Sequence, residues 1–492
     1  MSSFRYLSIA SLIKDRIKQG IYPEDRKLPS IRALAQELGV SKGTVIRSYE
    51  QLEDDGLIRA REKSGFFPLP QHLQRNNSKR PEAILSQQQK DALRPHRVDN
   101  KSLGIHIVRS AGRTDQVALG SANPCASFFG VKRLYRILQQ QIRKELSELE
   151  HGYLSHYQAP PGDPVLCQQV SLQLAERSIT TAPEEIIVTN GAQAAITLAL
   201  QSTTKEGDIV LIQSPCFYGI LQCLEALNRK VIEIPQSSDG GPDINILSSV
   251  LTEAQAQHWP VKAIVIQPTV HNPSGQSMPL NARKELLTLA RQYDLAVIED
   301  DVFAEFSEQS PQLPSLKALD SDNRVLFCSS VSKTLTPKIR IGWLVAGRWH
   351  EQCQHFQFVS KMGLPAHTQK ALGLWFEAGL MKRHLRQIKR QYHQRQQLFN
   401  QAMAHFWPDN IKHISPDGGF LIWIQLPEKM NSLPLYQWAQ QQQINITPGP
   451  LFSSQGDHQD YIRINFAMFQ NQPEYLQAMD KLGKQIRYMT GQ

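Results

Sequence analysis

A lysine set among serines is the first residue that could do chemistry. Lys333 lies in the stretch SSVSKTLTPKIRIGW, residues 329–343, which reads as a strand, a basic loop and a second strand. The amine of a lysine at such a turn can form a Schiff base with an aldehyde. Asp300 ends the predicted strand AVIED, where its carboxylate can face a ring nitrogen, and Phe217 in SPCFYG can stack on the ring. An aldehyde cofactor with a pyridine ring needs these three groups.

Donors for a phosphate group complete this set. Gly191, Ala192 and Gln193 open a predicted helix, whose free backbone N–H groups suit an anion. Ser330 adds a hydroxyl, and Arg340 adds a bidentate cation. Taken singly, each of these residues is better explained as a loop, cap or core residue. Together and in this order, they predict a site for pyridoxal 5'-phosphate.

The elements that must position these residues alternate between strand and helix. Helices are predicted in AQAAITLALQS and LNARKELLTLARQYD, and strands in EIIVTNG, DIVLIQSP, KVIEIP, AIVIQPT, AVIEDDV, VLFCSS and IRIGWLVAG. Short β-branched strands separated by helices favour an α/β fold with a mostly parallel sheet that is covered on both faces. Such sheets bind ligands at the carboxyl ends of their strands, which is where the candidate residues fall.

Three motifs stand in the order of a known family. They are His271–Gly275 (HNPSG), Ser330–Lys333 (SVSK) followed by Arg340, and Tyr461–Phe466 (YIRINF). With them, residues 115–485 resemble the aspartate-aminotransferase superfamily, fold type I of the pyridoxal-phosphate proteins. The resemblance implies a smaller C-terminal α+β subdomain and a homodimer with shared sites.

The same resemblance implies roles for further residues. Asn272 would bond the phenolate oxygen of the cofactor, and Arg463 would hold the α-carboxylate of an amino acid substrate or effector. Tyr157, in HYQAPPG, matches a tyrosine that reaches the phosphate of the neighbouring subunit. Phe303 departs from the family, because aminotransferases commonly have a tyrosine there that hydrogen-bonds the phenolate. This departure predicts weaker transamination.

The first seventy residues carry a helical pattern with clear start and stop signals. Apolar spacing predicts three helices: one ending near Gly20, one after Ser30, and one from Ser41 to Gly56. Two short strands around Lys63-Ser64-Gly65 follow as a wing. Two helices joined by a short turn that contains glycine form a helix-turn-helix.

The outer face of the third helix is suited to DNA. Lys42, Thr44, Arg47 and Ser48 fall on or near this face and its N-terminus, where base edges and phosphates would be reached. Arg32, early in the preceding helix, can grip the DNA backbone. A small helical interaction domain with a charged, solvated face is the alternative that spacing alone leaves open.

One stretch makes the prediction of DNA binding more specific. KLPSIRALAQELGVSKGTVIRSYEQLEDDGLI resembles the winged helix-turn-helix of GntR-type transcription regulators, which spans most of residues 5–68 here. The resemblance implies that Arg32, Lys42, Thr44 and the wing residue Gly65 contact double-stranded operator DNA. Many family members have arginine at the position of Lys42, and lysine keeps the charge but loses the bidentate geometry.

The distribution of charge supports a polyanion partner for the N-terminal end. The 492-residue chain has a formal net charge of +9, and residues 1–115 hold 21 Lys and Arg against 13 Asp and Glu. The remaining residues hold 33 against 32. The Gln-rich, basic stretch 71–115 is typical of a linker, so we expect a DNA-binding domain at 1–70, the linker, and a cofactor-binding domain at 116–492.

Composition also limits the class of protein. The six cysteines are irregularly spaced without a C-x-x-C pair, which favours reduced thiols over disulfides and predicts no metal site. The sequence has no run of eighteen apolar residues, and its N-terminus is charged where a signal peptide would be apolar. We therefore expect a cytoplasmic protein without a membrane partner.

The whole arrangement resembles the MocR subfamily of transcription regulators, in which a GntR-like domain, a linker and an aminotransferase-like domain share one chain. In that family the large domain forms a head-to-tail, domain-swapped homodimer, and pyridoxal phosphate or its adduct with an amine is the effector. The resemblance implies a regulator that senses the cofactor itself, or a small amine or amino acid through Lys333 and Arg463. The alternative is a working aminotransferase with an accessory DNA-binding domain.

Overall fold

The computed structural model describes residues 5–18, 22, 27–54, 57–61, 65–68, 93–98, 113, 115–125, 129–149, 157–309, 312–428 and 430–491. The chain forms two compact units, residues 1–82 and 83–492. Most of the predicted linker lies outside the described residues.

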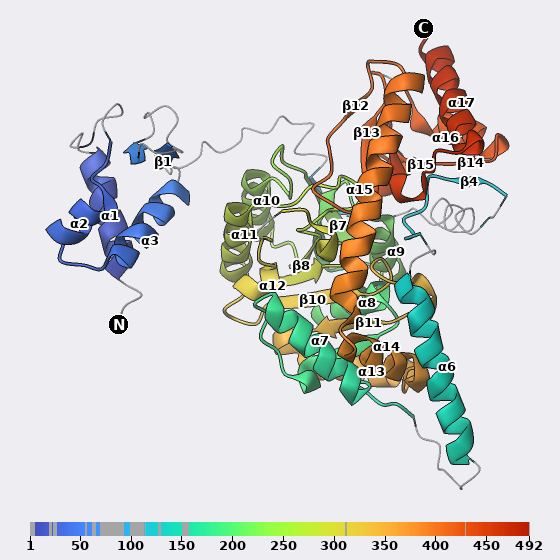
Figure 1. Cartoon of the computed structure of the whole chain (residues 1–492), viewed down its shortest axis with the longest axis horizontal. Helices are drawn as coiled ribbons and strands as arrows, with labels where there is room; N and C mark the ends of the chain where they lie inside the picture. The colour runs from blue at the N-terminus through green and yellow to red at the C-terminus, as the bar shows by residue number, and fades with distance from the viewer. Residues whose placement is uncertain are drawn as a thin grey trace. The chain divides into compact units, whose positions relative to one another are not determined.

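The N-terminal unit packs three helices around one apolar core (Figure 1). Ile13, Leu34, Val45 and Tyr49 are fully buried between them, which follows from their helical spacing. The strands after the third helix pair antiparallel, and Phe66 packs on Tyr49 with ring centroids 4.9 Å apart. The elements are α1 (Arg5–Lys18), α2 (Ile31–Glu37), α3 (Lys42–Asp54), β1 (Ile58–Arg61) and β2 (Gly65–Pro68).

The larger unit is built on a sheet that has eight strands within the described residues, in the order β3-β7-β6-β8-β9-β10-β11-β5. The five strands from β7 to β10 run parallel, whereas β11 is antiparallel to both of its neighbours. All seven predicted strands are present, and the prediction of a mostly parallel sheet is confirmed. The strands are β5 (Ile186–Thr189), β6 (Ile209–Ser214), β7 (Lys230–Pro235), β8 (Val261–Ile266), β9 (Ala296–Asp300), β10 (Val325–Ser330) and β11 (Gly342–Val345).

Helices cover both faces of this sheet. Along β6, Val210 and Ile212 pack in one cluster with α8 and α9, whereas Ile209 and Leu211 pack in another with α10 and α11. Because both faces are buried, the strands read as continuous apolar runs. The helices are α6 (Phe129–Leu149), α7 (Pro164–Glu176), α8 (Ala192–Thr203), α9 (Tyr218–Ala226), α10 (Ile244–Ala256), α11 (Leu280–Gln292), α12 (Leu316–Leu319), α13 (His350–Lys361) and α14 (Ala366–Glu377).

A smaller C-terminal subdomain follows α14. The long helix α15 leads into a sheet of four strands among the described residues, in the order β12-β13-β16-β15, with two more helices beside it (Figure 1). The elements are α15 (Leu380–Phe406), β12 (Lys412–His413), β13 (Leu421–Gln425), α16 (Ser432–Gln441), β14 (Ile444–Asn445), β15 (Thr447–Pro448), β16 (Tyr461–Asn465) and α17 (Pro473–Thr490). Strand β4 (Val117–Ala118) pairs in parallel with β14, so a segment that precedes the large sheet in sequence packs on the C-terminal subdomain. No helix in the described parts of the chain is both long and apolar enough to span a bilayer.

Among the short strands that were not predicted from the sequence, one lies in the predicted linker. β3 (His96–Arg97), inside the stretch interpreted as linker, adds antiparallel to the edge strand β7. The Nε2 atom of His96 also lies 2.6 Å from Oγ of Ser454 in the C-terminal subdomain. Residues 93–98 are therefore fastened to the larger unit at two points. A two-residue strand carries too little periodicity to be recognised in sequence.

Candidate functional site

The predicted cofactor residues come together in one cavity of about 130 Å³. It lies at the carboxyl ends of β9 and β10 and at the first turn of α8, as expected for a parallel sheet. Eight of the residues predicted to bind the cofactor line this cavity. The complete lining is Ala192, Gln193, Ile196, Phe217, Gln267, Asn272, Asp300, Val302, Phe303, Ser330, Ser332, Lys333 and Arg340.

Lys333 places its amine inside this cavity. Its Nζ donates a hydrogen bond to the carbonyl oxygen of Ala122, 2.7 Å away. Burial, together with the positive charges of Arg463 and Arg340, lowers the pKa of Lys333 to about 8, although Asp300 opposes the shift. A lower pKa leaves more neutral, nucleophilic amine near neutral pH, which is what attachment to an aldehyde requires.

Asp300 is a buried acid at the end of β9. One carboxylate oxygen accepts a hydrogen bond from the backbone N–H of Val302, 3.2 Å away. Burial raises the pKa of Asp300 to about 7, because water no longer stabilises the charged form. A protonated ring nitrogen placed against it would restore the carboxylate, so the residue fits a pyridine cofactor.

The phosphate end is shaped by a glycine. Gly191 has φ +81° just before α8, and a Cβ at this position would lie 2.8 Å from Nη2 of Arg340. The same Nη2 donates to the carbonyl oxygen of Asn190 over 2.7 Å, which holds the guanidinium against the turn. The helix N-terminus and the cation therefore face one small space, together with Ser330.

The side chain of Gln193 is already engaged within the protein. Its side-chain amide donates to the carbonyl oxygen of Gly219 over 2.7 Å, so the side chain fastens α8 to α9. Its backbone at the start of the helix remains the group suited to an anion. Ser332 and Gln267, to which no role was assigned from sequence, also line the cavity. The amide oxygen of Gln267 accepts a hydrogen bond from N–H of Asn272 over 2.7 Å; its place just after a strand was the available signal.

Arg463 is the buried cation beside this cavity. It is 0% exposed, its Nη1 donates to Oδ1 of Asn272 over 3.1 Å, and its Nη2 donates to the carbonyl oxygen of Gly120 over 2.7 Å. Its guanidinium lies 5.1 Å from the ring centre of Phe452. Among the described residues no carboxylate pairs with Arg463, its Nε has no hydrogen-bond partner, and burial lowers its pKa to about 10. A buried, unpaired guanidinium fits the carboxylate of a ligand.

Two aromatic positions have different outcomes. Phe303 lines the cavity and packs on Phe420 with ring centroids 5.3 Å apart, so this wall carries no hydroxyl. Tyr157 is 77% exposed and is not part of the lining of the cavity in its own chain.

The DNA-binding candidates lie on the surface of the N-terminal unit, with one exception. Lys42, Arg47 and Arg32 are exposed, Thr44 is half-buried, and Gly65 is exposed with φ +105° in the wing. The interpretation of Ser48 as an outer-face residue was wrong, because it is 0% exposed and its Oγ donates to the carbonyl oxygen of Thr44 over 2.8 Å. A small polar side chain can satisfy itself on the preceding turn and remain in the core.

Comparisons with known proteins agree with both units. Residues 116–478 match the family model of aminotransferase class I and II, and residues 5–67 match that of bacterial regulatory proteins of the gntR family. The chain is 33% identical to the uncharacterized HTH-type transcriptional regulator YdcR of Escherichia coli K12, over 98% of this chain and 99% of the relative. It is 27% identical to the probable rhizopine catabolism regulatory protein MocR of Rhizobium meliloti, over 89% and 84% of the two chains. The crystal structure of a multiple substrate aminotransferase from Thermococcus profundus superposes with a TM-score of 0.72 at 21% identity, covering 83% of this chain and 98% of that one.

Proposed function

The chain belongs to the aminotransferase class I and II family and carries a GntR-type helix-turn-helix domain, as MocR-type transcription regulators do, and from this premise we propose that a small amino acid or amine is its effector. Its large domain has the fold that binds pyridoxal phosphate, and its small domain is of a DNA-binding type. The proposal concerns what the aminotransferase-like domain senses and how the DNA-binding domain responds.

The observation that carries the proposal is the state of Arg463. A guanidinium with no carboxylate partner among the described residues, fully buried and hydrogen-bonded to Asn272, is costly unless a ligand supplies the missing anion. An α-carboxylate matches a guanidinium in geometry and charge. Amino acids carry this group together with the amine that the cofactor site would take.

The residues of the cavity divide the work between them. When bound, pyridoxal phosphate supplies an electrophilic aldehyde carbon for amines. Lys333 would hold the cofactor through its amine, Asp300 would keep the ring nitrogen protonated, and Phe217 would cover the ring. Gly191, Ala192, Gln193, Ser330 and Arg340 bind the phosphate, and Asn272 directs its amide nitrogen to the phenolate oxygen.

In this proposal, the effector changes DNA affinity by shifting the populations of two arrangements of the chain. The effector favours one of two arrangements of the chain by the difference between its affinities for them, and this difference limits its influence on DNA affinity. In the DNA-bound state Arg32, Lys42 and Arg47 contact phosphates, while Thr44 and Gly65 approach the groove. The functional parts are residues 1–70, the linker 71–115 and residues 116–492.

The large domain works as a head-to-tail homodimer in this proposal. Tyr157, exposed in its own chain, reaches the phosphate of the second copy. Support comes from the apolar residues Tyr135, Ile142, Leu146 and Leu149, which are exposed on α6 at spacings that place them on one side. An exposed apolar stripe of this kind is typical of an interface.

The deciding experiment is an electrophoretic mobility shift on the chain's own upstream DNA. It compares cofactor-free protein, protein with pyridoxal phosphate, and protein with cofactor plus single amino acids or amines. We expect the DNA affinity to change only when a suitable amine is added, and to stop responding in Lys333→Ala. Lys338→Ala, in the same loop but exposed, is the matched control and should behave as wild type.

Other outcomes separate the alternatives. A response to the cofactor alone would identify a sensor of pyridoxal phosphate. Steady transamination of an amino acid with a 2-oxo acid, without any specific DNA complex, would identify an enzyme and refute the regulator.

A further inference from the structure

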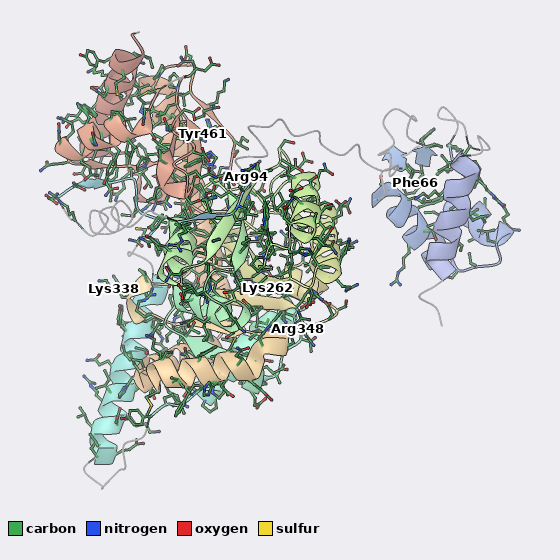
Figure 2. All side chains as sticks on the ribbon, turned by 180° about the vertical axis from the view of Figure 1, so that it is seen from behind. Phe66, Arg94, Lys262, Lys338, Arg348 and Tyr461 are labelled. Atoms are coloured by element: carbon green, nitrogen blue, oxygen red, sulfur yellow. The ribbon has the colours of Figure 1, made fainter. Side chains whose placement is uncertain are left out.

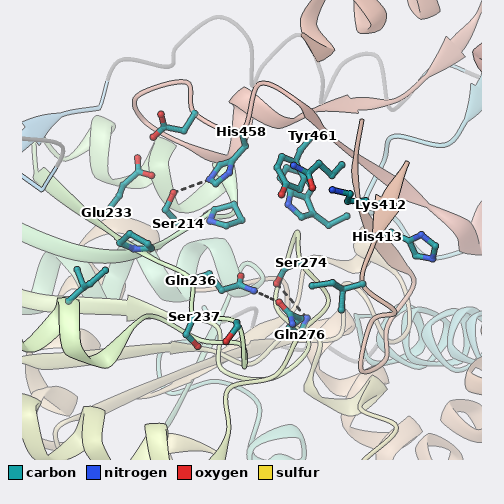
Figure 3. A pocket seen from close by; sticks show the side chains of 18 of the residues that line it. Ser214, Glu233, Gln236, Ser237, Ser274, Gln276, Lys412, His413, His458 and Tyr461 are labelled. Atoms are coloured by element: carbon teal, nitrogen blue, oxygen red, sulfur yellow. Dashed lines mark hydrogen bonds between the residues drawn. The ribbon is translucent and has the colours of Figure 1, made fainter. Parts of the chain in front are cut away.

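A second cavity, of about 660 Å³, lies on the other side of the loop that carries Asn272. Within the described residues the two cavities share no lining residue, since Asn272 faces the smaller one and Ser274 and Gln276 the larger. The larger cavity opens at the carboxyl ends of β6 and β7 and is closed by β12, β13 and β16 of the C-terminal subdomain (Figure 3). Its size and its place between two subdomains are those of small-molecule sites.

Glu233, on β7, is a buried carboxylate in the wall of this cavity. It is 5% exposed, and its Oε1 accepts hydrogen bonds from the backbone N–H of Ser454 over 2.6 Å and from Oγ of Ser453 over 3.2 Å. Its Oε2 accepts no hydrogen bond from any described residue. Within the described chain, no lysine, arginine or histidine forms an ion pair with it either. A buried charge without a counter-ion is costly, so a cation in the cavity would be stabilised here.

A second carboxylate strengthens this preference. Oγ of Ser453 lies 3.2 Å from Oε1 of Glu233 and 3.2 Å from Oδ2 of Asp457. A hydroxyl has one hydrogen and can donate it to only one of these two oxygens. The hydroxyl of Ser453 therefore cannot stabilise both carboxylates at once, and a cation beside them would relieve their repulsion.

The neighbouring wall is aromatic. Trp423 and Tyr461 stack with ring centroids 5.0 Å apart and planes 12° apart, and His458 meets Tyr461 edge-on at 5.9 Å. Aromatic faces attract ammonium and guanidinium groups. Figure 3 shows Glu233 and His458 towards one end of the cavity, with Lys412 at the other, so the two ends differ in charge.

We propose that this cavity is a second ligand site, which binds a small organic cation of the amine or guanidine type with its charge at Glu233 and Asp457. The site is separate from the cofactor cavity and does not require a reaction with the cofactor. Its ligand is held by charge pairing and by the Trp423–Tyr461 wall.

The site is also placed to influence the start of the larger unit. Oγ of Ser454 contacts both Oε1 of Glu233, at 2.5 Å, and Nε2 of His96, at 2.6 Å. His96 lies in β3, which pairs with β7, the strand that carries Glu233. A cation at Glu233 thus competes for the hydrogen bonds that fasten residues 93–98, through which the chain continues from the DNA-binding unit.

The test uses full-length holoprotein treated with borohydride, which fixes the cofactor to its lysine and prevents amines from reacting there. Tyramine and agmatine are titrated by calorimetry, and tyrosol, the uncharged alcohol that matches tyramine, serves as the neutral probe. We expect saturable binding of at least one amine and none of tyrosol. If the chain takes up no cofactor, the sensor proposal fails, but the same titration on untreated protein still tests the second ligand site. The failure of one proposal can therefore be told from the failure of the other.

Variants locate the binding. Glu233→Gln should weaken the bound amine at least about tenfold, whereas Glu253→Gln, an exposed carboxylate on α10, should leave affinity unchanged. Lys412 is exposed at the other end of the cavity, so Lys412→Glu should strengthen binding of the amine. This variant keeps the proposal testable if Glu233→Gln folds poorly. Absence of binding up to about 10 mM, binding of tyrosol as tight as tyramine, or unchanged affinity in both cavity variants would each overturn the proposal.

Discussion

Arg463 donates a hydrogen bond from Nη1 to Oδ1 of Asn272 over 3.1 Å, although the two residues are 191 positions apart in the chain. Asn272 lines the cofactor cavity, whereas Arg463 lies behind it on β16. The bond uses the amide oxygen of Asn272, and so its amide nitrogen remains the group able to face the cofactor. A carboxylate that binds Arg463 would therefore act on a residue that lines the cavity proposed for the cofactor.

A first prediction concerns selectivity for carboxylates. In Arg463→Lys the charge remains, but the two-pronged geometry is lost, so amino acids should perturb the cofactor spectrum with about a hundredfold lower affinity. Amines without a carboxylate should bind the variant and the wild type alike. The measurement is a titration of visible absorbance with an amino acid and with the amine that corresponds to its decarboxylated form. An equal loss for both ligands would show that Arg463 supports the fold and does not recognise the carboxylate.

The pKa of Asp300 gives a second prediction, for the cofactor-free chain. Burial raises this pKa from 3.8 to about 7, so between about pH 4 and pH 7 the folded chain keeps a proton that the unfolded chain has released. Stability therefore falls as the pH rises through this window, by up to about 4 kcal/mol. Asp300→Asn should match the wild type near pH 4, resist more urea at pH 8, and bind the cofactor less tightly.

Tryptophan fluorescence is a suitable readout for this experiment, because all seven tryptophans lie after residue 115 and report on the larger unit alone. Asp239→Asn, at an exposed position, is the control and should show no such pH dependence. If the stability difference between Asp300→Asn and wild type is the same at pH 4 and pH 8, the carboxylate is not buried in the cofactor-free chain.

The sequence indicated which residues share the smaller cavity, because these residues follow strand ends. Asp300, Ser330 and Asn272 each come after a continuous apolar run, and parallel strands bring such positions to one edge of the sheet. Long-range contacts were out of reach of this reasoning. The bond of Lys333 to Ala122 and the network from Glu233 to His96 join segments whose approach depends on how the C-terminal subdomain packs.

Ser48 shows another limit of sequence patterns. Helical spacing places it near the outer face of α3, but the face has no sharp edge and a serine fits either side. The structure buries it through one backbone hydrogen bond, a choice set by the packing of α1 against α3.

Phe303 provides a third prediction. It lines the cofactor cavity at the position where aminotransferases commonly have tyrosine, so Phe303→Tyr would add a hydroxyl towards the phenolate oxygen. We expect amino acid turnover with a 2-oxo acid to rise about tenfold and the pH at which the bound cofactor changes colour to fall. Phe356, on α13, packs against an apolar cluster and does not line the cavity, so Phe356→Tyr controls for a general effect of the hydroxyl. A variant whose rate and spectrum both equal the wild type would show that Phe303 does not limit catalysis.

The last prediction concerns α3, which carries both exposed basic residues and a buried serine. Lys42 and Arg47 are exposed on α3, so Lys42→Ala and Arg47→Ala should each weaken DNA binding and reduce the slope of log affinity against log salt by about 1. Ser48→Ala removes a buried hydrogen bond on the same helix, so it should lower thermal stability and leave the salt slope unchanged. The measurement is DNA binding by fluorescence anisotropy at several salt concentrations, with Lys205→Ala, exposed on the larger unit, as the control. If the salt slope is the same in all four variants, the face of α3 that carries Lys42 and Arg47 does not meet the phosphates, and the proposed orientation of this helix on DNA is wrong.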